Sequence, residues 1–168
     1  RSLVTLIGPG GVGKSALARA IAAEVGPSCP DGSCVTELAA LGESAAVLAT
    51  VARHLDLVVD DARPLDAIRA MARLDALLVL DDCERVVDEV ADLADRLLAV
   101  PGCALRVVAT SRVRLGSSAE TVVPVGPLDV DAARELFAAR ARAAVPSWDL
   151  DLAGTGQVDR LLDELDRL

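Results

Sequence analysis

Residues 8–15 read Gly8-Pro9-Gly10-Gly11-Val12-Gly13-Lys14-Ser15, and this stretch decides the fold of the chain. The spacing Gly-x-x-x-x-Gly-Lys-Ser lies between an apolar run and a helical pattern, the context of a phosphate-binding loop. Glycines let backbone N–H groups converge on phosphates, and the following helix adds about half a positive charge at its N-terminus. We therefore expect the phosphates of a nucleotide to be bound by Gly8, Gly10, Gly11, Val12, Gly13, Lys14, Ser15 and Ala16.

Two side chains of this loop have definite chemical roles. Lys14 is the only lysine in a chain that otherwise uses arginine as its cation. A compact ammonium suits the middle of a phosphate cradle, where a planar guanidinium is too large. We expect Lys14 to contact the β- and γ-phosphates and to act in catalysis, and the Ser15 hydroxyl to ligate Mg²⁺.

Short apolar runs alternate with amphipathic helical patterns along the whole chain. This alternation predicts an α/β domain with a largely parallel sheet. Strands buried on both faces are predicted at residues 3–7, 34–38, 76–80, 105–109 and 121–125. Apolar helical stripes are predicted at residues 17–25, 47–55, 86–97, 133–141 and 158–168.

The expected organisation is one nucleotide-binding domain at residues 1–145, followed at 146–168 by a loop and the start of a helical segment. Arg1 leads directly into a predicted strand, and Leu168 falls within a helical pattern. We therefore interpret the sequence as a fragment of a longer chain. Trp148, in the predicted loop, is expected to be a packing anchor.

A second polar segment follows the apolar residues 77–80, which run directly into Asp81 and Asp82. In open α/β sheets, ligands bind at the carboxyl ends of the strands. After a complete phosphate-binding loop, we expect Asp81 to hold Mg²⁺ through water. Asp82, or alternatively Glu84, is expected to be the catalytic base that positions the attacking water.

A further predicted strand ends in Thr110, Ser111 and Arg112, at the same edge of the sheet. Arg112 is interpreted as a catalytic sensor, pairing with the γ-phosphate of ATP and losing that partner in ADP. Arg114 is a second choice for this role. The alternative is an exposed arginine at a strand end, with no contact to a ligand.

The loop also satisfies the pattern Gly8-x-Gly10-x-x-Gly13, and Glu37 follows where a dinucleotide-binding Rossmann domain keeps its ribose-binding acid. That pattern is weak alone and gives no role to Lys14 and Ser15. The phosphate-binding loop of an NTPase is therefore the favoured interpretation.

Composition limits the partners that the chain is expected to bind and the cell compartment in which it is expected to fold. The net charge is -9 and aromatic residues make up 1% of the chain, whereas nucleic-acid surfaces need clustered Lys and Arg. We expect no direct nucleic-acid contact and, without an apolar run of about 18 residues, no membrane insertion. Four unevenly spaced cysteines, in a chain able to fold without disulfides, indicate a reducing cytoplasm.

Three segments together resemble the STAND class of P-loop ATPases, specifically the NB-ARC-like domain of bacterial transcriptional regulators of the SARP and LuxR types. They are residues 3–15, residues 78–84 and residues 109–112, with a fourth match at 134–137. The resemblance implies a three-layer P-loop NTPase fold with a parallel five-stranded sheet of order 5-1-4-3-2. It also implies a slow ATPase that converts ATP and water to ADP and phosphate.

The same resemblance implies a regulatory switch, closed with ADP and opened by exchange for ATP, which then forms a homo-oligomer. Its partners would be ATP or ADP with Mg²⁺ and the helical and effector domains of its own polypeptide. The family often reads Asp-Asn-Cys-Glu-His where this chain has residues 81–85 as Asp-Asp-Cys-Glu-Arg, which leaves the base open between Asp82 and Glu84. Other readings are a P-loop enzyme such as a kinase, an AAA-type motor ATPase, and a scaffold with a vestigial site.

Overall fold

The computed structural model describes residues 2–41, 47–60, 63–148 and 154–165. The chain forms two compact units. One comprises Arg1–Gly8 and Lys14–Pro124, and the other comprises Pro9–Gly13 and Val125–Leu168. The sheet lies entirely in the first unit, whereas the middle of the glycine-rich loop belongs to the second.

All five strands pair in parallel in one sheet of order β2-β3-β4-β1-β5. Read from the other edge, this is the predicted order 5-1-4-3-2, which is confirmed. Each strand lies within two residues of its predicted position. The strands are β1 (Ser2–Ile7), β2 (Ser33–Glu37), β3 (Leu77–Asp81), β4 (Arg106–Ser111) and β5 (Glu120–Pro124).

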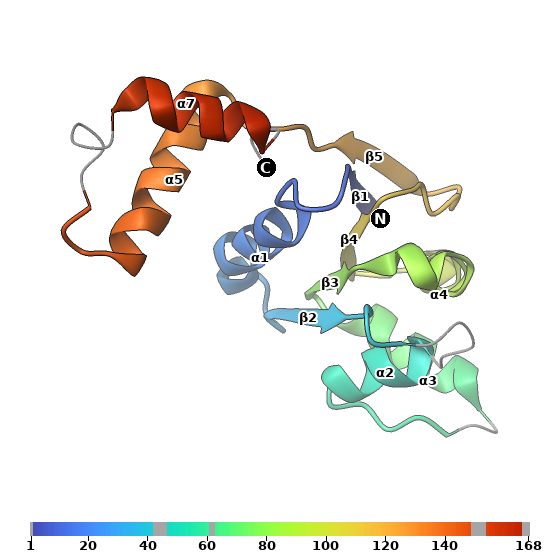
Figure 1. Ribbon diagram of the computed structural model, residues 1–168. Coiled ribbons are helices and arrows are strands. Elements are labelled where there is room, and N and C mark those ends of the chain that lie inside the picture. The colour runs from blue at the N-terminus through green and yellow to red at the C-terminus, as the bar shows by residue number, and fades with distance from the viewer. Residues whose placement is uncertain (1, 42–46, 61–62, 149–153, 166–168) are drawn as a thin grey trace. The chain divides into compact units, whose positions relative to one another are not determined.

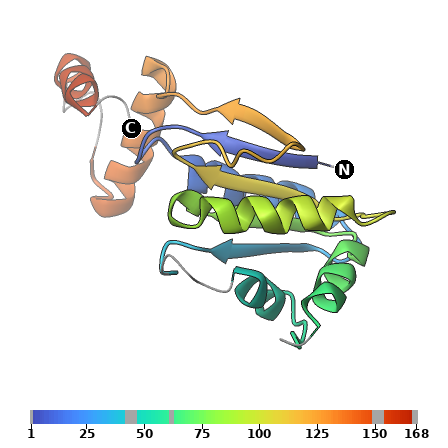
Figure 2. The same cartoon turned by 90° about the vertical axis from the view of Figure 1, so that its right-hand side faces the viewer.

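Helices cover both faces of this sheet, which completes the predicted three layers. Figures 1 and 2 show α1 (Lys14–Val25) on one face and α4 (Val87–Ala99) on the opposite face. The helices α2 (Val47–His54) and α3 (Pro64–Arg73) pack beside α4. Two short 3₁₀ turns, η1 (Gly26–Ser28) and η2 (Cys83–Arg85), follow α1 and β3.

The core is aliphatic and centres on the inner strands. Every residue of β3 is buried, as are five of the six residues of β4. The prediction that all five strands are buried on both faces is wrong for β2 and β5, where most residues are exposed or half-buried. Both are edge strands with one neighbouring strand, so fewer side chains cover them.

Two helical predictions need correction. Leu17, which begins the apolar stripe predicted at residues 17–25, is exposed. The buried residues of α1 are instead Lys14, Ala18 and Ala22. Small side chains let a helix approach a sheet closely. No helix was predicted at α3, although Pro64 at its start and the buried Ile68 and Met71 fit a helix.

In the second unit, α5 (Val130–Ala144) packs against α7 (Thr155–Glu164). A small core of Ala133, Val158 and Leu162 joins them, and Phe137 and Trp148 pack against it. The two rings meet edge to face with centroids 5.6 Å apart, so the predicted packing role of Trp148 is confirmed. Leu168 lies outside the described residues, and the predicted domain boundary at residue 145 stays a prediction.

Candidate functional site

The polar residues singled out in the sequence lie at the carboxyl edge of the sheet. The strand register pairs Glu37 with Asp81, and pairs Leu80 with Ala109, which places Thr110 beside Asp81. Residues 7 and 111 are likewise register partners, so Gly8 leaves β1 at the same edge. This is the edge at which ligands bind in open α/β sheets.

Lys14 begins α1 and is buried, although lysine is rarely buried without a partner. Its Nζ donates a hydrogen bond to the backbone oxygen of Gly8, 3.0 Å away. The ammonium is therefore held at the point where the chain leaves β1. Ser15 is half-buried and Ala16 is exposed in the first turn of the helix, where backbone N–H groups lack helical partners.

The loop between Gly8 and Lys14 belongs to the second compact unit, and its backbone conformation is distinctive by itself. Gly11 and Gly13 have φ angles of 84° and 94°. These angles lie in a region that glycine adopts freely and that side chains with a Cβ atom disfavour. The backbone path therefore requires glycine at positions 11 and 13.

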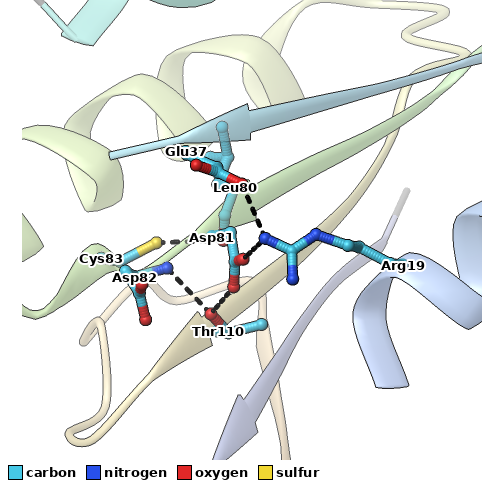
Figure 3. A network of polar contacts seen from close by, with 7 residues as sticks. All are labelled: Arg19, Glu37, Leu80, Asp81, Asp82, Cys83 and Thr110. Atoms are coloured by element: carbon cyan, nitrogen blue, oxygen red, sulfur yellow. Dashed lines mark hydrogen bonds and ion pairs between the residues drawn. The ribbon is translucent and has the colours of Figure 1, made fainter. Parts of the chain in front are cut away.

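Asp81 ends β3 and is 1% exposed. The hydroxyl of Thr110 donates to its Oδ1 at 2.6 Å, and Nη2 of Arg19 donates to its Oδ2 at 3.0 Å. Figure 3 shows this carboxylate between the two side chains. Because both oxygens have a donor, the buried carboxylate has a fixed orientation and a counter-charge.

Asp82 follows in a left-handed conformation, with φ 60° and ψ 58°. Its backbone N–H donates to the same Thr110 hydroxyl at 2.9 Å, which anchors this unusual turn. Burial raises the pKa of the Asp82 carboxyl, and the neighbouring charges of Asp81 and Glu84 raise this pKa further. A raised pKa makes the Asp82 carboxylate a stronger base, which suits a group that accepts a proton from water.

Glu84 and Arg112 form an ion pair, with Nε of Arg112 3.1 Å from Oε1 of Glu84. The second oxygen of Glu84, Oε2, is buried and has no hydrogen-bond partner among the described residues, while the side chain of Arg112 is 64% exposed. The structure therefore brings the two residues together. Arg112 pairs with the Glu84 carboxylate, whereas the sequence suggested the γ-phosphate of ATP as its partner.

The remaining residues of this edge have structural partners. Ser111 accepts a hydrogen bond from the N–H of Val113 at 3.2 Å. Cys83 is buried and donates to the backbone oxygen of Leu80 at 3.3 Å. Burial raises the pKa of the Cys83 thiol, which makes it a poor nucleophile.

Arg19 was missed by sequence reasoning. Its Nη2 contacts Oε1 of Glu37 at 2.7 Å as well as Asp81. Glu37, considered in the sequence as a ribose-binding acid, is thus held by an arginine of α1. The one available signal was that Glu37 and Asp81 both lie at the ends of predicted strands, because carboxylates that gather at one sheet edge need a cation nearby.

The donor set fits magnesium and phosphate chemistry. Magnesium prefers oxygen ligands, and commonly uses one or two protein groups together with phosphate oxygens and water. The buried Asp81 carboxylate and the Ser15 hydroxyl supply such oxygens, and Lys14 supplies the cation. Among the described residues, no group of three or more His, Cys, Asp or Glu is arranged to hold a metal ion without a ligand's help.

Comparison with known proteins agrees with this chemistry. Residues 4–100, more than half of the chain, match the family model described as "ATPase family associated with various cellular activities (AAA)". The match includes the glycine-rich loop, Arg19, Glu37 and the end of β3.

Two proteins of Mycobacterium tuberculosis are similar over nearly the whole chain. One, named "Putative HTH-type transcriptional regulator", is 39% identical over an alignment 168 positions long, which covers 96% of this chain and 19% of that protein. The other, named an uncharacterized protein, is 36% identical over 172 residues and is matched over 43% of its length. The chain thus spans less than half of either relative.

Solved structures share the fold. A STAND protein with a tetratricopeptide repeat sensor from Pyrococcus horikoshii aligns over 97% of this chain and 25% of its own, with TM-score 0.55 and 20% identity. Cdc6p from Pyrobaculum aerophilum aligns over 84% of this chain and 43% of its own, with TM-score 0.61 and 18% identity. Within the described residues, no helix combines the length and apolarity that crossing a membrane requires.

Proposed function

The chain belongs to the AAA family of ATPases, and we propose that within this family it is an ATP/ADP-binding switch module with slow hydrolysis. The single observation that carries the proposal is the carboxyl edge of the sheet. The sheet has the strand order of a P-loop NTPase. At its carboxyl edge, the buried and fixed Asp81 carboxylate ends β3, and the buried Lys14 begins α1. Such groups are costly to bury unless they are used or compensated.

We assign the roles as follows. Lys14 and the backbone of Gly8, Gly10, Gly11, Val12, Gly13, Ser15 and Ala16 bind the phosphates. The Ser15 hydroxyl ligates Mg²⁺, and the Asp81 carboxylate holds the ion through water. The metal, when bound, neutralises phosphate charge that develops during hydrolysis.

Slow hydrolysis is supported by the way in which the candidate catalytic groups are engaged. Asp82, with its raised pKa, is the candidate base, and its backbone is anchored to Thr110. Glu84, the alternative base, is paired with Arg112. An arginine that neutralises a carboxylate is not available to a γ-phosphate until that pair opens, so Arg112 responds to ATP only after a rearrangement.

The setting is a larger regulator. The M. tuberculosis relative named as a transcriptional regulator is about five times as long as the matched region, which supports a role as one module among others. We propose that the module acts on the helical and effector domains of its own polypeptide and forms a homo-oligomer with ATP. The net charge of -9 supports a module without direct nucleic-acid contact, and its four free cysteines support a cytoplasmic location.

The test combines turnover with nucleotide release. We expect steady-state hydrolysis well below the roughly 1–10³ s⁻¹ of ordinary enzymes, limited by release of ADP. Asp82→Asn should slow single-turnover hydrolysis by about 100-fold or more and leave ADP affinity nearly unchanged. Glu84→Gln is the matched variant, and a larger loss there would transfer the role of base to Glu84.

A motor ATPase is the second candidate, because the AAA family match covers the same residues. Fast turnover that depends on protein concentration, with an arginine supplied by a neighbouring subunit, would favour the motor. Turnover that stays slow at all protein concentrations would favour the switch.

A further inference from the structure

We propose that Arg19 is a positioning residue for the magnesium-binding aspartate, and that it sets the magnesium requirement of the site by competing with the metal for Asp81 Oδ2. The inference rests on the proposed function, since it concerns the same nucleotide site. It adds a residue outside the glycine-rich loop and the acidic strand end.

The geometry places one nitrogen between two carboxylates. Nη2 of Arg19 lies 2.7 Å from Oε1 of Glu37 and 3.0 Å from Oδ2 of Asp81 (Figure 3). Thr110 already donates to the other oxygen, Oδ1 of Asp81. A cation that approaches Asp81 thus meets one oxygen held by a hydroxyl and one held by a guanidinium.

The side chains of Asp81, Arg19 and Glu37 differ in their exposure to solvent. The side chain of Asp81 is 2% exposed, whereas those of Arg19 and Glu37 are 49% and 69% exposed. The aspartate is fixed in the sheet, whereas the arginine reaches it from a helix surface and can turn away once another cation takes its place. Glu37 offers Arg19 a position to keep when it leaves Asp81.

Charge explains why a cation is needed there. Asp81, Asp82 and Glu37 crowd the ends of two neighbouring strands, and the Asp81 charge is buried. An unpaired buried carboxylate is strongly destabilising, so Arg19 supplies the counter-charge in the metal-free protein. Magnesium supplies the same counter-charge when bound, which makes the two cations alternatives at Oδ2.

Competition has a thermodynamic signature. If magnesium must displace Arg19 from Oδ2, loss of Arg19 destabilises the metal-free protein and strengthens the effect of magnesium on nucleotide affinity. A purely structural ion pair would lower stability without changing that effect. The two possibilities therefore differ in a quantity other than hydrolysis.

The experiment measures the dissociation constant of ADP for the full-length protein in EDTA and in saturating Mg²⁺, and compares their ratio among variants. We expect Arg19→Gln to raise the ratio by about tenfold, within the usual range of coupling between sites. Arg19→Lys, which keeps the cation, should return the ratio toward the original value. In EDTA without nucleotide, Arg19→Gln should also lower the thermal midpoint, and Mg-ADP should recover part of the loss.

Two control variants separate contact from general electrostatics. Arg85→Gln removes an exposed positive charge from η2, which follows the same strand end. Arg106→Gln breaks an ion pair with Asp75 beside the first residue of β4. Both should leave the ratio near that of the unmodified protein.

An Arg19→Gln ratio equal to that of the unmodified protein, or matched by Arg85→Gln, would overturn the competition. Absence of ADP binding to the unmodified protein in both EDTA and Mg²⁺ would instead overturn the proposed function, and the inference with it. Normal ADP binding with an unchanged ratio therefore isolates a failure of the inference alone.

Discussion

Two arginine–aspartate ion pairs at opposite edges of one sheet use the same side chains in different ways. At the carboxyl edge, Arg19 contacts Asp81, whose side chain is 2% exposed. At the amino edge, Arg106 contacts Asp75 at the shorter distance of 2.6 Å, but that aspartate is 47% exposed. By distance alone, the Arg106–Asp75 pair would be expected to be the stronger one. The burial of Asp81 instead gives the Arg19–Asp81 pair the greater importance.

The difference follows from solvation. A half-exposed ion pair contributes about 0–1 kcal/mol, because water and salt screen it. Loss of the partner of a buried charge costs more, up to about 3–5 kcal/mol where both partners are buried, because the remaining charge loses its compensation. The carboxyl edge therefore retains an aspartate that is costly for the fold, which is expected where a ligand uses it.

The largest expected effect comes from removing the buried charge itself. We expect Asp81→Asn to weaken magnesium-dependent ADP binding by about 100-fold or more, since even residues that only orient metal ligands cost about 10–100-fold. Asp75→Asn is the matched control and should leave ADP binding unchanged. Titration calorimetry with Mg-ADP distinguishes them, and a full magnesium effect in Asp81→Asn would place the metal elsewhere.

The next effect comes from the hydroxyl that holds Asp81. Thr110→Val removes the donor to Oδ1 and the acceptor of the Asp82 N–H, at an expected cost of about 1–3 kcal/mol. Each kcal/mol lowers the thermal midpoint of a domain of this size by about 2–4 °C. Thr110→Ser keeps the hydroxyl and should stay close to the original midpoint. Equal midpoints for the Val and Ser variants would show that the hydroxyl does not hold the carboxylate.

A third carboxylate, Glu120, is held by backbone amides, and its removal is expected to give the smallest effect. The N–H groups of Leu115 and Gly116 donate to Glu120 at 2.9 and 3.1 Å. Burial acts to raise the pKa of the Glu120 carboxyl, but these donors, together with the Thr5 hydroxyl and the charge of Arg114, outweigh burial and the pKa is lowered. The stabilisation is therefore full above the ordinary pKa of glutamate and is lost as pH falls through the lowered value.

Glu120→Gln should thus cost about 1 kcal/mol at neutral pH and nothing once the native carboxyl is protonated. Thermal midpoints of both proteins, measured from neutral pH down through the acid range, check this. The two curves should converge at low pH. A constant gap across the whole range would assign the cost to packing rather than to charge.

Much of the fold could be predicted because its signals are local. The five apolar runs, the alternation of periodicities and the glycine-rich loop are each readable within about ten residues, and the strand order came from the family resemblance. What failed depends on tertiary packing. Ala18 and Ala22, not the larger Leu17, face the sheet in α1, and α3 was missed because its polar residues obscured a short apolar stripe.

The candidate site divides in the same way. Asp81 and Asp82 follow a predicted strand, and Lys14 belongs to the glycine-rich motif. Their location at the carboxyl edge of the sheet could therefore be predicted. Arg19 could not, because its reach to Asp81 depends on the rotation of α1 that the small alanines permit. The pairing of Arg112 with Glu84 follows a left-handed turn at Asp82, which no local sequence pattern predicts.

The most direct test of the central claim is the thermal midpoint of the protein and of Lys14→Ala with Mg-ADP, Mg-ATP, Mg-GTP and NAD. A ligand at 100 times its dissociation constant adds about 2.7 kcal/mol, which a melt resolves. We expect ADP and ATP to stabilise the unmodified protein, with ADP the stronger, and neither to stabilise Lys14→Ala. The ligand-free midpoint of Lys14→Ala establishes that the variant is folded. Stabilisation by NAD would contradict the NTPase site, and an undiminished ADP shift in folded Lys14→Ala would contradict a phosphate site at this edge of the sheet.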